Sequence, residues 1–173
     1  MHTMTPEAII AALDLSPHPE GGYYRETYRA ELALPADALG RDYAGPRNAC
    51  TGIYYLLTSD TFSAMHRVRS DELFHFYTGD PVELLRLRAD GSGDVVTLGT
   101  DLLAGLQPQA LVPAGDWQGA ALAPGGTFAL MGCTVAPGFA FEDFDLGGRA
   151  DLQARWPEFA THIAQRTREP AKD

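Results

Sequence analysis

The feature that most constrains this chain is a series of short β-like runs that occupies residues 50–135. Each run has the length and apolar content of a strand, and turn signals rich in Gly, Pro, Asp and Ser separate it from the next. Short strands at this spacing, joined by hairpin turns, are typical of an antiparallel sandwich or barrel. The runs are CTGIYYLL, TFSAMHRV, ELFHFYT, VELLRLR, DVVTLG, QALVP, WQGAAL and TFALMGCTV. They predict an all-β fold.

Short helices are expected on both sides of these strands. The N-terminal TPE combines a capping threonine, a proline suited to the first helical position and a glutamate at the positive end of the helix dipole. SPHPEGG should be a loop and YYRETYR a further strand, while residues 30–49 read as a long loop with a helical turn near Pro35–Leu39. We expect one domain over residues 1–173, with a helix at about 5–14, a β-barrel at about 20–145 and a helical segment at about 149–167.

The charge of the chain limits its partners. The formal net charge of −10 disfavours nucleic acids and anionic membranes, which bind through basic patches. No apolar run approaches the roughly 20 residues that span a bilayer, and the N-terminus does not resemble a secretory signal. The protein is therefore expected to be cytoplasmic and to bind a small molecule.

The stretch FSAMHRVRSDELFHFY carries the chemistry-bearing side chains. In an extended strand, His66 shares a face with Ala64 and Val68, and this small, apolar face should point into the barrel. If Glu72 also points inward, as Phe74 then must, His75 points outward. Alternation therefore predicts a buried pair of His66 and Glu72, and it does not bring both histidines to one ion.

These residues resemble the first motif of cupins, G-x5-H-x-H-x3,4-E-x6-G. His66, Glu72 and Gly79 match its first histidine, its glutamate and its closing glycine, while Val68 replaces the second histidine. In the second motif, Pro113 and Gly115 match P-x-G, and the histidine position is Gln118. The resemblance implies a cupin-like double-stranded β-helix, which is a jelly-roll barrel.

A more specific resemblance covers four blocks in order. HPEGGYYRETYR, TGIYYLL, FSAMHRVRSDELFHFY and GCTVAPGFAFEDFDL are similar to the signature blocks of the cupin-5 family, domain of unknown function 985. Members are often labelled predicted sugar epimerases by analogy with metal-free deoxysugar-nucleotide 3,5-epimerases. Because cupin barrels commonly pair, the resemblance also implies a homodimer.

The cupin metal positions read His66, Val68, Glu72 and Gln118 here. Two good ligands and one amide make a weak site for a first-row metal. We therefore expect no cofactor and no tight metal, although an adventitious divalent ion can be held by the weak candidates His66, Glu72 and Gln118.

His66 and Glu72 are the candidate catalytic residues. A carboxylate that accepts a hydrogen bond from one ring nitrogen leaves the other as a base, and it favours the charged imidazole. Such a pair suits proton abstraction next to a carbonyl. The analogous epimerases use a tyrosine acid from a late strand, and the run TFALMGCTV contains no tyrosine. The alternative is a structural role, in which His66 is a core histidine whose hydrogen bonds are satisfied.

Several other residues are candidates for ligand binding. Arginine grips carboxylates or phosphates through paired hydrogen bonds, and an inward glutamine suits polar recognition. Surface charge remains the alternative for Arg25, and barrel filling for the aromatic residues. His2, His18 and His162 are expected in solvent. The ligand-binding candidates are Gln118, Arg25, Tyr24, Glu20, Phe74, Phe141 and Asp143.

The sequence is compatible with three functions. The first is a metal-independent isomerase or epimerase that acts on a small polar or sugar-derived substrate. The second is a module that binds a small ligand without chemistry. The third, which the ligand positions favour least, is a metal-dependent cupin enzyme.

Overall fold

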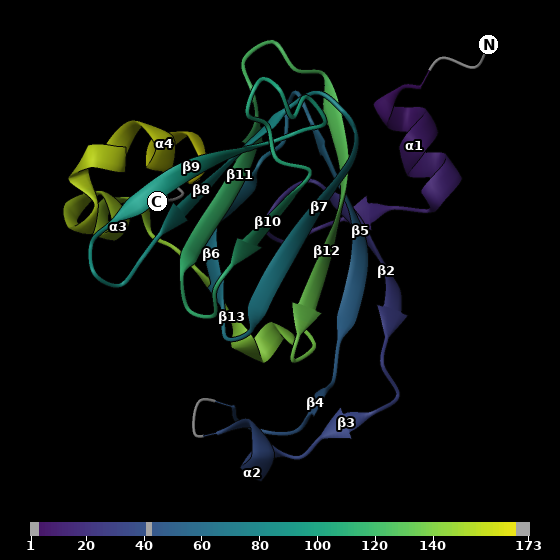
Figure 1. Ribbon diagram of the computed structural model, residues 1–173, viewed down its shortest axis with the longest axis vertical. Coiled ribbons are helices and arrows are strands. Elements are labelled where there is room, and N and C mark those ends of the chain that lie inside the picture. Colours follow the sequence, from purple (N-terminus) through teal and green to yellow (C-terminus); the bar gives the residue numbers. More distant parts are fainter. Residues whose placement is uncertain (1–3, 41–42, 169–173) are drawn as a thin grey trace, which may run out of the picture.

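A computed structural model describes residues 4–40 and 43–168. It shows a six-stranded sheet in the order β1-β2-β5-β12-β7-β10 that faces a five-stranded sheet in the order β13-β6-β11-β8-β9 (Figure 1). Every ladder between these strands is antiparallel, as the hairpin pattern predicts. The strands are β1 Ser16–Pro17, β2 Tyr23–Arg29, β3 Ala33–Leu34, β4 Arg47–Asn48, β5 Thr51–Thr58, β6 Ser63–Val68, β7 Asp71–Gly79, β8 Val82–Leu87, β9 Gly93–Leu98, β10 Gln109–Val112, β11 Trp117–Leu122, β12 Phe128–Ala136 and β13 Phe144–Leu146.

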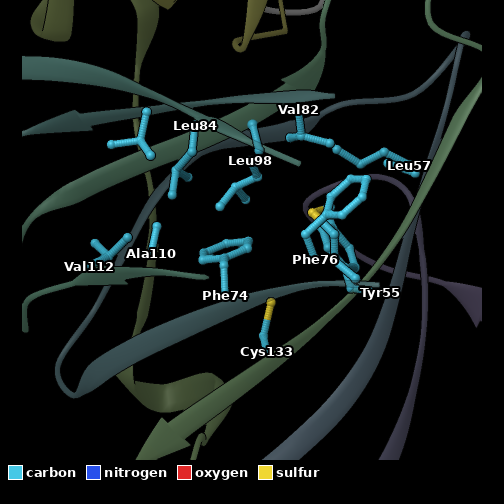
Figure 2. Packing of buried hydrophobic residues seen from close by; sticks show 14 residues of the cluster. Tyr55, Leu57, Phe74, Phe76, Val82, Leu84, Leu98, Ala110, Val112 and Cys133 are labelled. Atoms are coloured by element: carbon cyan, nitrogen blue, oxygen red, sulfur yellow. The ribbon is translucent and has the colours of Figure 1, made fainter. Parts of the chain in front are cut away.

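The facing sides of the two sheets form the main core. Phe74 of β7 and Cys133 of β12 point toward Leu84 and Leu98 of the opposite sheet (Figure 2). Alternation along each strand sends every second apolar side chain inward, and burial removes these side chains from water. Phe74, Leu84 and Leu98 are each at most 1% exposed, so this part of the barrel is closed by packing.

Helices cover the two outer faces. α1 (Pro6–Leu13) begins at Thr5, whose side chain accepts from Ala8 N, and its Ile9 packs on Leu56 of the six-stranded sheet. α3 (Arg149–Arg155), η2 (Pro157–Phe159) and α4 (Ala160–Gln165) cover the five-stranded sheet, where Trp156 and Ile163 join a second core cluster. In the described part of the chain, no helix has the length and apolarity required to cross a bilayer.

The predicted jelly-roll fold is confirmed, and the predicted strands agree with the observed bounds to within about two residues, which is the usual spread of such assignments. The helical turn near residues 35–39 is also present, as α2 (Ala36–Leu39). Two predicted loops contain strands: SPHPEGG contains β1, and residues 30–49 contain the antiparallel pair β3 and β4. The aromatic stretch FAFEDFDL forms a 3-10 turn, η1 (Phe141–Asp143), followed by β13.

Candidate functional site

A pocket of about 360 Å³ opens beside the core. β2, β5, β6, β7 and β12 supply its walls, and the segment before η1 borders it. Apolar side chains alternate with ionisable ones around it. The lining residues are Asp14, Ser16, His18, Glu20, Tyr24, Arg25, Glu26, Arg29, Thr51, Ile53, His66, Val68, Glu72, Cys133, Val135, Phe139, Ala140 and Phe141.

His66 lies at the centre of the polar part of this pocket and is 2% exposed. Its Nδ1 lies 2.8 Å from the carbonyl oxygen of Ala64. A carbonyl only accepts, so Nδ1 carries a proton and donates it. Nε2 then faces two carboxylates, 3.4 Å from Glu20 Oε2 and 4.0 Å from Glu72 Oε2. The predicted inward pair is present, and a second carboxylate joins it.

The two carboxylates determine the charge of His66. Burial alone lowers the pKa of the imidazole, but the negative charge of Glu20, the interaction with Glu72 and the bond to Ala64 together outweigh it. They raise the pKa of His66 from 6.5 to about 9. The ring is therefore an imidazolium at neutral pH, which makes it a proton donor rather than the free base that the sequence suggests.

Glu20 reaches the pocket from a tight loop. Gly21 and Gly22 follow it with positive φ values of 116° and 70°, and a Cβ at Gly21 would overlap the carbonyl of Phe62. Only glycine allows the backbone to pass this close. Tyr55 Oη donates to Gly21 O at 2.8 Å and anchors the loop from the barrel side.

A β-bulge brings a third group to Glu20. In the β6–β11 ladder, Gln118 pairs with His66, but Ala120 pairs with Ser63, so β6 contains one extra residue between these pairs. The bulge changes the parity of β6, and Ser63 Oγ donates to Glu20 Oε1 at 2.8 Å. Uninterrupted alternation along β6 would place Ser63 on the face opposite His66. The bulge reverses this and brings the Ser63 hydroxyl to the pocket side.

Gln118 supports Glu72 from the opposite sheet. Its Nε2 donates to Glu72 Oε2 at 2.6 Å, and the side chain is completely buried. Gln118 Oε1 is buried and, among the described residues, has no hydrogen-bond partner. The glutamine therefore acts behind Glu72, and it is not one of the lining residues of the pocket.

His18 was expected in solvent, and the structure corrects this. Its side chain is 7% exposed and lines the pocket, where its ring contacts Tyr24 edge-on at 4.5 Å and stacks on Phe141 at 6.3 Å. Burial lowers the pKa of His18 despite the nearby Glu20, so the ring is neutral at neutral pH. His162 is also only partly exposed and lies 3.5 Å from Arg166 Nη1, whereas His2 lies outside the described residues.

The other predicted ligand-binding residues divide into two groups. Tyr24, Arg25 and Phe141 line the pocket, although the guanidinium of Arg25 lies over the ring of Tyr54 at 5.7 Å. Phe74 lies in the core cluster. Asp143 is 4% exposed and accepts two hydrogen bonds from Arg47, at 2.6 and 2.8 Å, so its carboxylate holds η1 in place rather than lining the cavity.

The expected outward direction of His75 is confirmed. Its Nε2 lies 3.0 Å from Thr134 Oγ1 and its Nδ1 accepts from Gln109, both on the outer face of the six-stranded sheet. Tyr77 is on the same face and is 49% exposed. Neither side chain lines the pocket.

The donor set does not suit a transition metal. Val68 and Gln118 replace two of the cupin ligand positions, and Gln118 directs its amide nitrogen at Glu72, so only His66 Nε2 and Glu72 remain of the set. Across residues 4–40 and 43–168, no three His, Cys, Asp or Glu side chains are grouped so that they could hold a metal ion. Imidazoles and carboxylates with free lone pairs are what such ions need.

Similar proteins share this architecture. A hypothetical protein from Leishmania major has a solved structure with a TM-score of 0.86 and 31% identity, over 96% of this chain and 100% of that chain. A crystal structure from Shewanella oneidensis gives a TM-score of 0.86 and 34% identity, over 97% and 100%. An uncharacterised protein of Saccharomyces cerevisiae is 30% identical over 168 residues, which are 91% of this chain and 84% of the yeast protein.

More distant structures share the fold alone. Oxalate decarboxylase from Bacillus subtilis matches with a TM-score of 0.53 and 13% identity, over 93% of this chain and 39% of that chain. Residues 7–147 match the family described as "Cupin superfamily (DUF985)". Together with the jelly-roll fold and the relatives above, this match shows that the chain belongs to the cupin-5 family, DUF985, of the cupin superfamily.

Proposed function

We propose that this protein is a metal-independent isomerase or epimerase that moves a proton on a small polar molecule bound beside His66. The observation that carries the proposal is the imidazole ring that faces two carboxylates at the edge of the pocket. Acid and base groups within reach of one ligand are the minimum requirement for proton transfer at carbon. A pocket of about 360 Å³ lies in the range of small-molecule sites.

The roles follow from the charges. The His66 imidazolium donates a proton from Nε2, while Glu20 or Glu72 accepts one as a carboxylate. In a proton shift next to a carbonyl, the carboxylate would take the proton from carbon and His66 would donate a hydrogen bond to the carbonyl oxygen, where negative charge develops. In an isomerisation, the carboxyl group then returns its proton to the neighbouring carbon. In an epimerisation, the His66 imidazolium protonates the opposite face of the planar intermediate, and the carboxyl group passes its proton back to the imidazole.

This assignment removes the need for a tyrosine acid. Tyr55 is not available as an acid, because its hydroxyl donates to Gly21 O and burial raises the pKa of Tyr55 well above the ordinary value. Tyr24 lines the pocket, but the mechanism does not require it. His66 itself supplies the acid, and the second carboxylate supplies the base.

Deuterium exchange tests the reaction class without knowledge of the product. Small carbonyl compounds, including aldoses and ketoses, are incubated with the protein in D₂O, and mass spectrometry follows deuterium uptake at carbon. His66→Gln and Glu72→Gln should each lower the uptake by about 10²-fold or more. His75→Gln on the outer face is the matched control and should leave it unchanged. Equal uptake with wild type and His66→Gln would reject the proposal.

A non-catalytic binding module is the second candidate. The apolar part of the wall, formed by Ile53, Val68, Val135 and Phe139, favours it because such surface binds without chemistry. It predicts saturable stabilisation by a ligand in thermal shift and no deuterium uptake by that ligand.

We also propose that the protein is a cytoplasmic homodimer. Tyr28, Tyr77 and Leu111 are 57%, 49% and 45% exposed on the six-stranded sheet, and large apolar side chains at the surface favour an interface. Light scattering that gives the mass of one chain at micromolar concentration would contradict the dimer.

A further inference from the structure

The polar part of the pocket has more acceptors than donors. Glu20 and Glu72 both present carboxylate oxygens to it. The donors of the same cluster already face these carboxylates: Ser63 Oγ donates to Glu20, Gln118 Nε2 donates to Glu72, and the single N–H of His66 Nε2 is shared between the two, at 3.4 and 4.0 Å. A ligand that completes this cluster must therefore bring donors of its own.

The buried charges do not balance either. Glu20 and Glu72 are 8% exposed and carry two negative charges, against the single positive charge of His66. The neighbouring His18 adds none, because burial lowers its pKa and the ring stays neutral. An excess negative charge in a poorly hydrated site is unfavourable unless an opposite charge approaches it.

The guanidiniums at the pocket do not offer an anion site. Arg29 donates to both oxygens of Glu26, at 2.8 and 2.7 Å. Arg25 lines the pocket, but its guanidinium is engaged over the ring of Tyr54 at 5.7 Å. A phosphate or carboxylate would have to displace one of these partners and then approach an acidic cluster. The lining carries four carboxylates against two guanidiniums and one imidazolium, namely Asp14, Glu20, Glu26 and Glu72 against Arg25, Arg29 and His66.

We infer that the ligand of this pocket is a small hydroxylated molecule with one protonated amine, which lies against Glu20 and Glu72. The ammonium group donates to one of the two carboxylates and neutralises the excess charge, which leaves the other carboxylate as the base, and hydroxyl groups donate to the oxygens that remain free. The inference deepens the proposed function, since it names the substrate class of the same site. It excludes nucleotide diphosphates, whose negative charges the cluster repels.

A matched set of three probes tests this charge preference. The compounds are trans-4-aminocyclohexanol, cyclohexane-1,4-diol and 4-hydroxycyclohexanecarboxylate, which share the ring and one hydroxyl and differ in charge. Ligand-observed NMR measures their dissociation constants with the full chain at neutral pH and moderate salt. The amine should bind about tenfold or more tightly than the diol, and the carboxylate should bind most weakly.

Variants connect the preference to the site. Glu20→Gln removes one negative charge and should bring the amine and the diol to within about threefold of each other. Glu158→Gln, an exposed glutamate on η2 at the opposite sheet, is the control and should preserve the preference. Circular dichroism confirms that both variants are folded.

Three results would overturn the inference: tighter binding of the diol or the carboxylate than of the amine, an unchanged preference in Glu20→Gln, or no saturable binding of the amine up to tens of millimolar. Because these measurements need no turnover, they are separate from the deuterium-exchange test. Loss of exchange with a retained amine preference would reject the reaction and leave the ligand class standing.

Discussion

The charge of His66 makes the stability of the fold depend on pH. The folded protein raises the pKa of His66 from 6.5 to about 9 through its two carboxylate neighbours. At about 1.4 kcal/mol for each tenfold change in proton affinity, this corresponds to about 3 kcal/mol of stabilisation when the ring is charged in both states. The contribution is fully present below the unfolded value of 6.5 and is lost as the pH rises through about 9. Within that window, the free energy of unfolding should fall by about 1.4 kcal/mol per pH unit on account of His66.

Urea unfolding of wild type and His66→Gln at several pH values between about 6 and 10 measures this effect. The difference between the two proteins isolates His66, because cysteines and other groups titrate in both. NMR of the imidazole gives the pKa directly, and Glu20→Gln should lower it because the carboxylate nearest to Nε2 is removed. The control is His75→Gln, because the His75 ring contacts Thr134 on the outer face of the sheet. This variant should show the same dependence of the free energy of unfolding on pH as the wild type. A His66 titration midpoint at or below 6.5, or parallel stability curves for wild type and His66→Gln, would refute the reasoning.

Four further predictions follow from particular contacts. Gly21→Ala should lower the free energy of unfolding by at least about 2 kcal/mol, because the added Cβ overlaps the carbonyl of Phe62. It should also lower the pKa of His66, because the shifted loop displaces Glu20. Urea unfolding measures the first effect and NMR of the imidazole measures the second. Phe74→Ala should cost about 3–5 kcal/mol by urea unfolding, whereas Leu103→Ala at a fully exposed position should cost nothing measurable. Asp143→Asn should cost about 3 kcal/mol in the same assay, because it breaks the buried pair with Arg47. Elemental analysis of protein purified without chelator should find less than about a tenth of an equivalent of iron, manganese, nickel or zinc, and a full equivalent would contradict our reading of the donor set.

The fold was predictable because most strands carry their own signals. Alternation and turn residues set the bounds of β5 to β12, and the TPE start predicted α1. The missed elements are short and depend on tertiary contacts. β1 consists of two residues, which no periodicity can reveal, and pairing with β2 creates it. η1 is held by the Arg47–Asp143 pair, whose partners lie far apart in the chain.

The site was predictable only where alternation continues without interruption. Parity along β7 placed Glu72 and Phe74 inward and His75 outward, as observed. The bulge in β6 changes the parity of Ser63, and no turn residue in the sequence marks it. His18 was misplaced because an exposed-looking HPEGG segment folds back over the barrel, and the two glycines that permit this were the available signal.

The arrangement of acids around His66 also explains why the ring is not simply a core histidine. A satisfied core imidazole needs one carbonyl and one further partner, whereas His66 has the carbonyl of Ala64 and two carboxylates, Glu20 at 3.4 Å and Glu72 at 4.0 Å. The fold adds Glu20, and it uses a loop with two glycines, a bulge and a hydroxyl from Ser63 to hold it there. Glu20 stabilises the imidazolium, but a second buried carboxylate is also electrostatically unfavourable beside the first, and the cluster keeps one negative charge in excess. Buried ionisable groups that shift the pKa of one another beside a pocket are typical of sites that act on a ligand, and this favours a functional role for the cluster over a structural one.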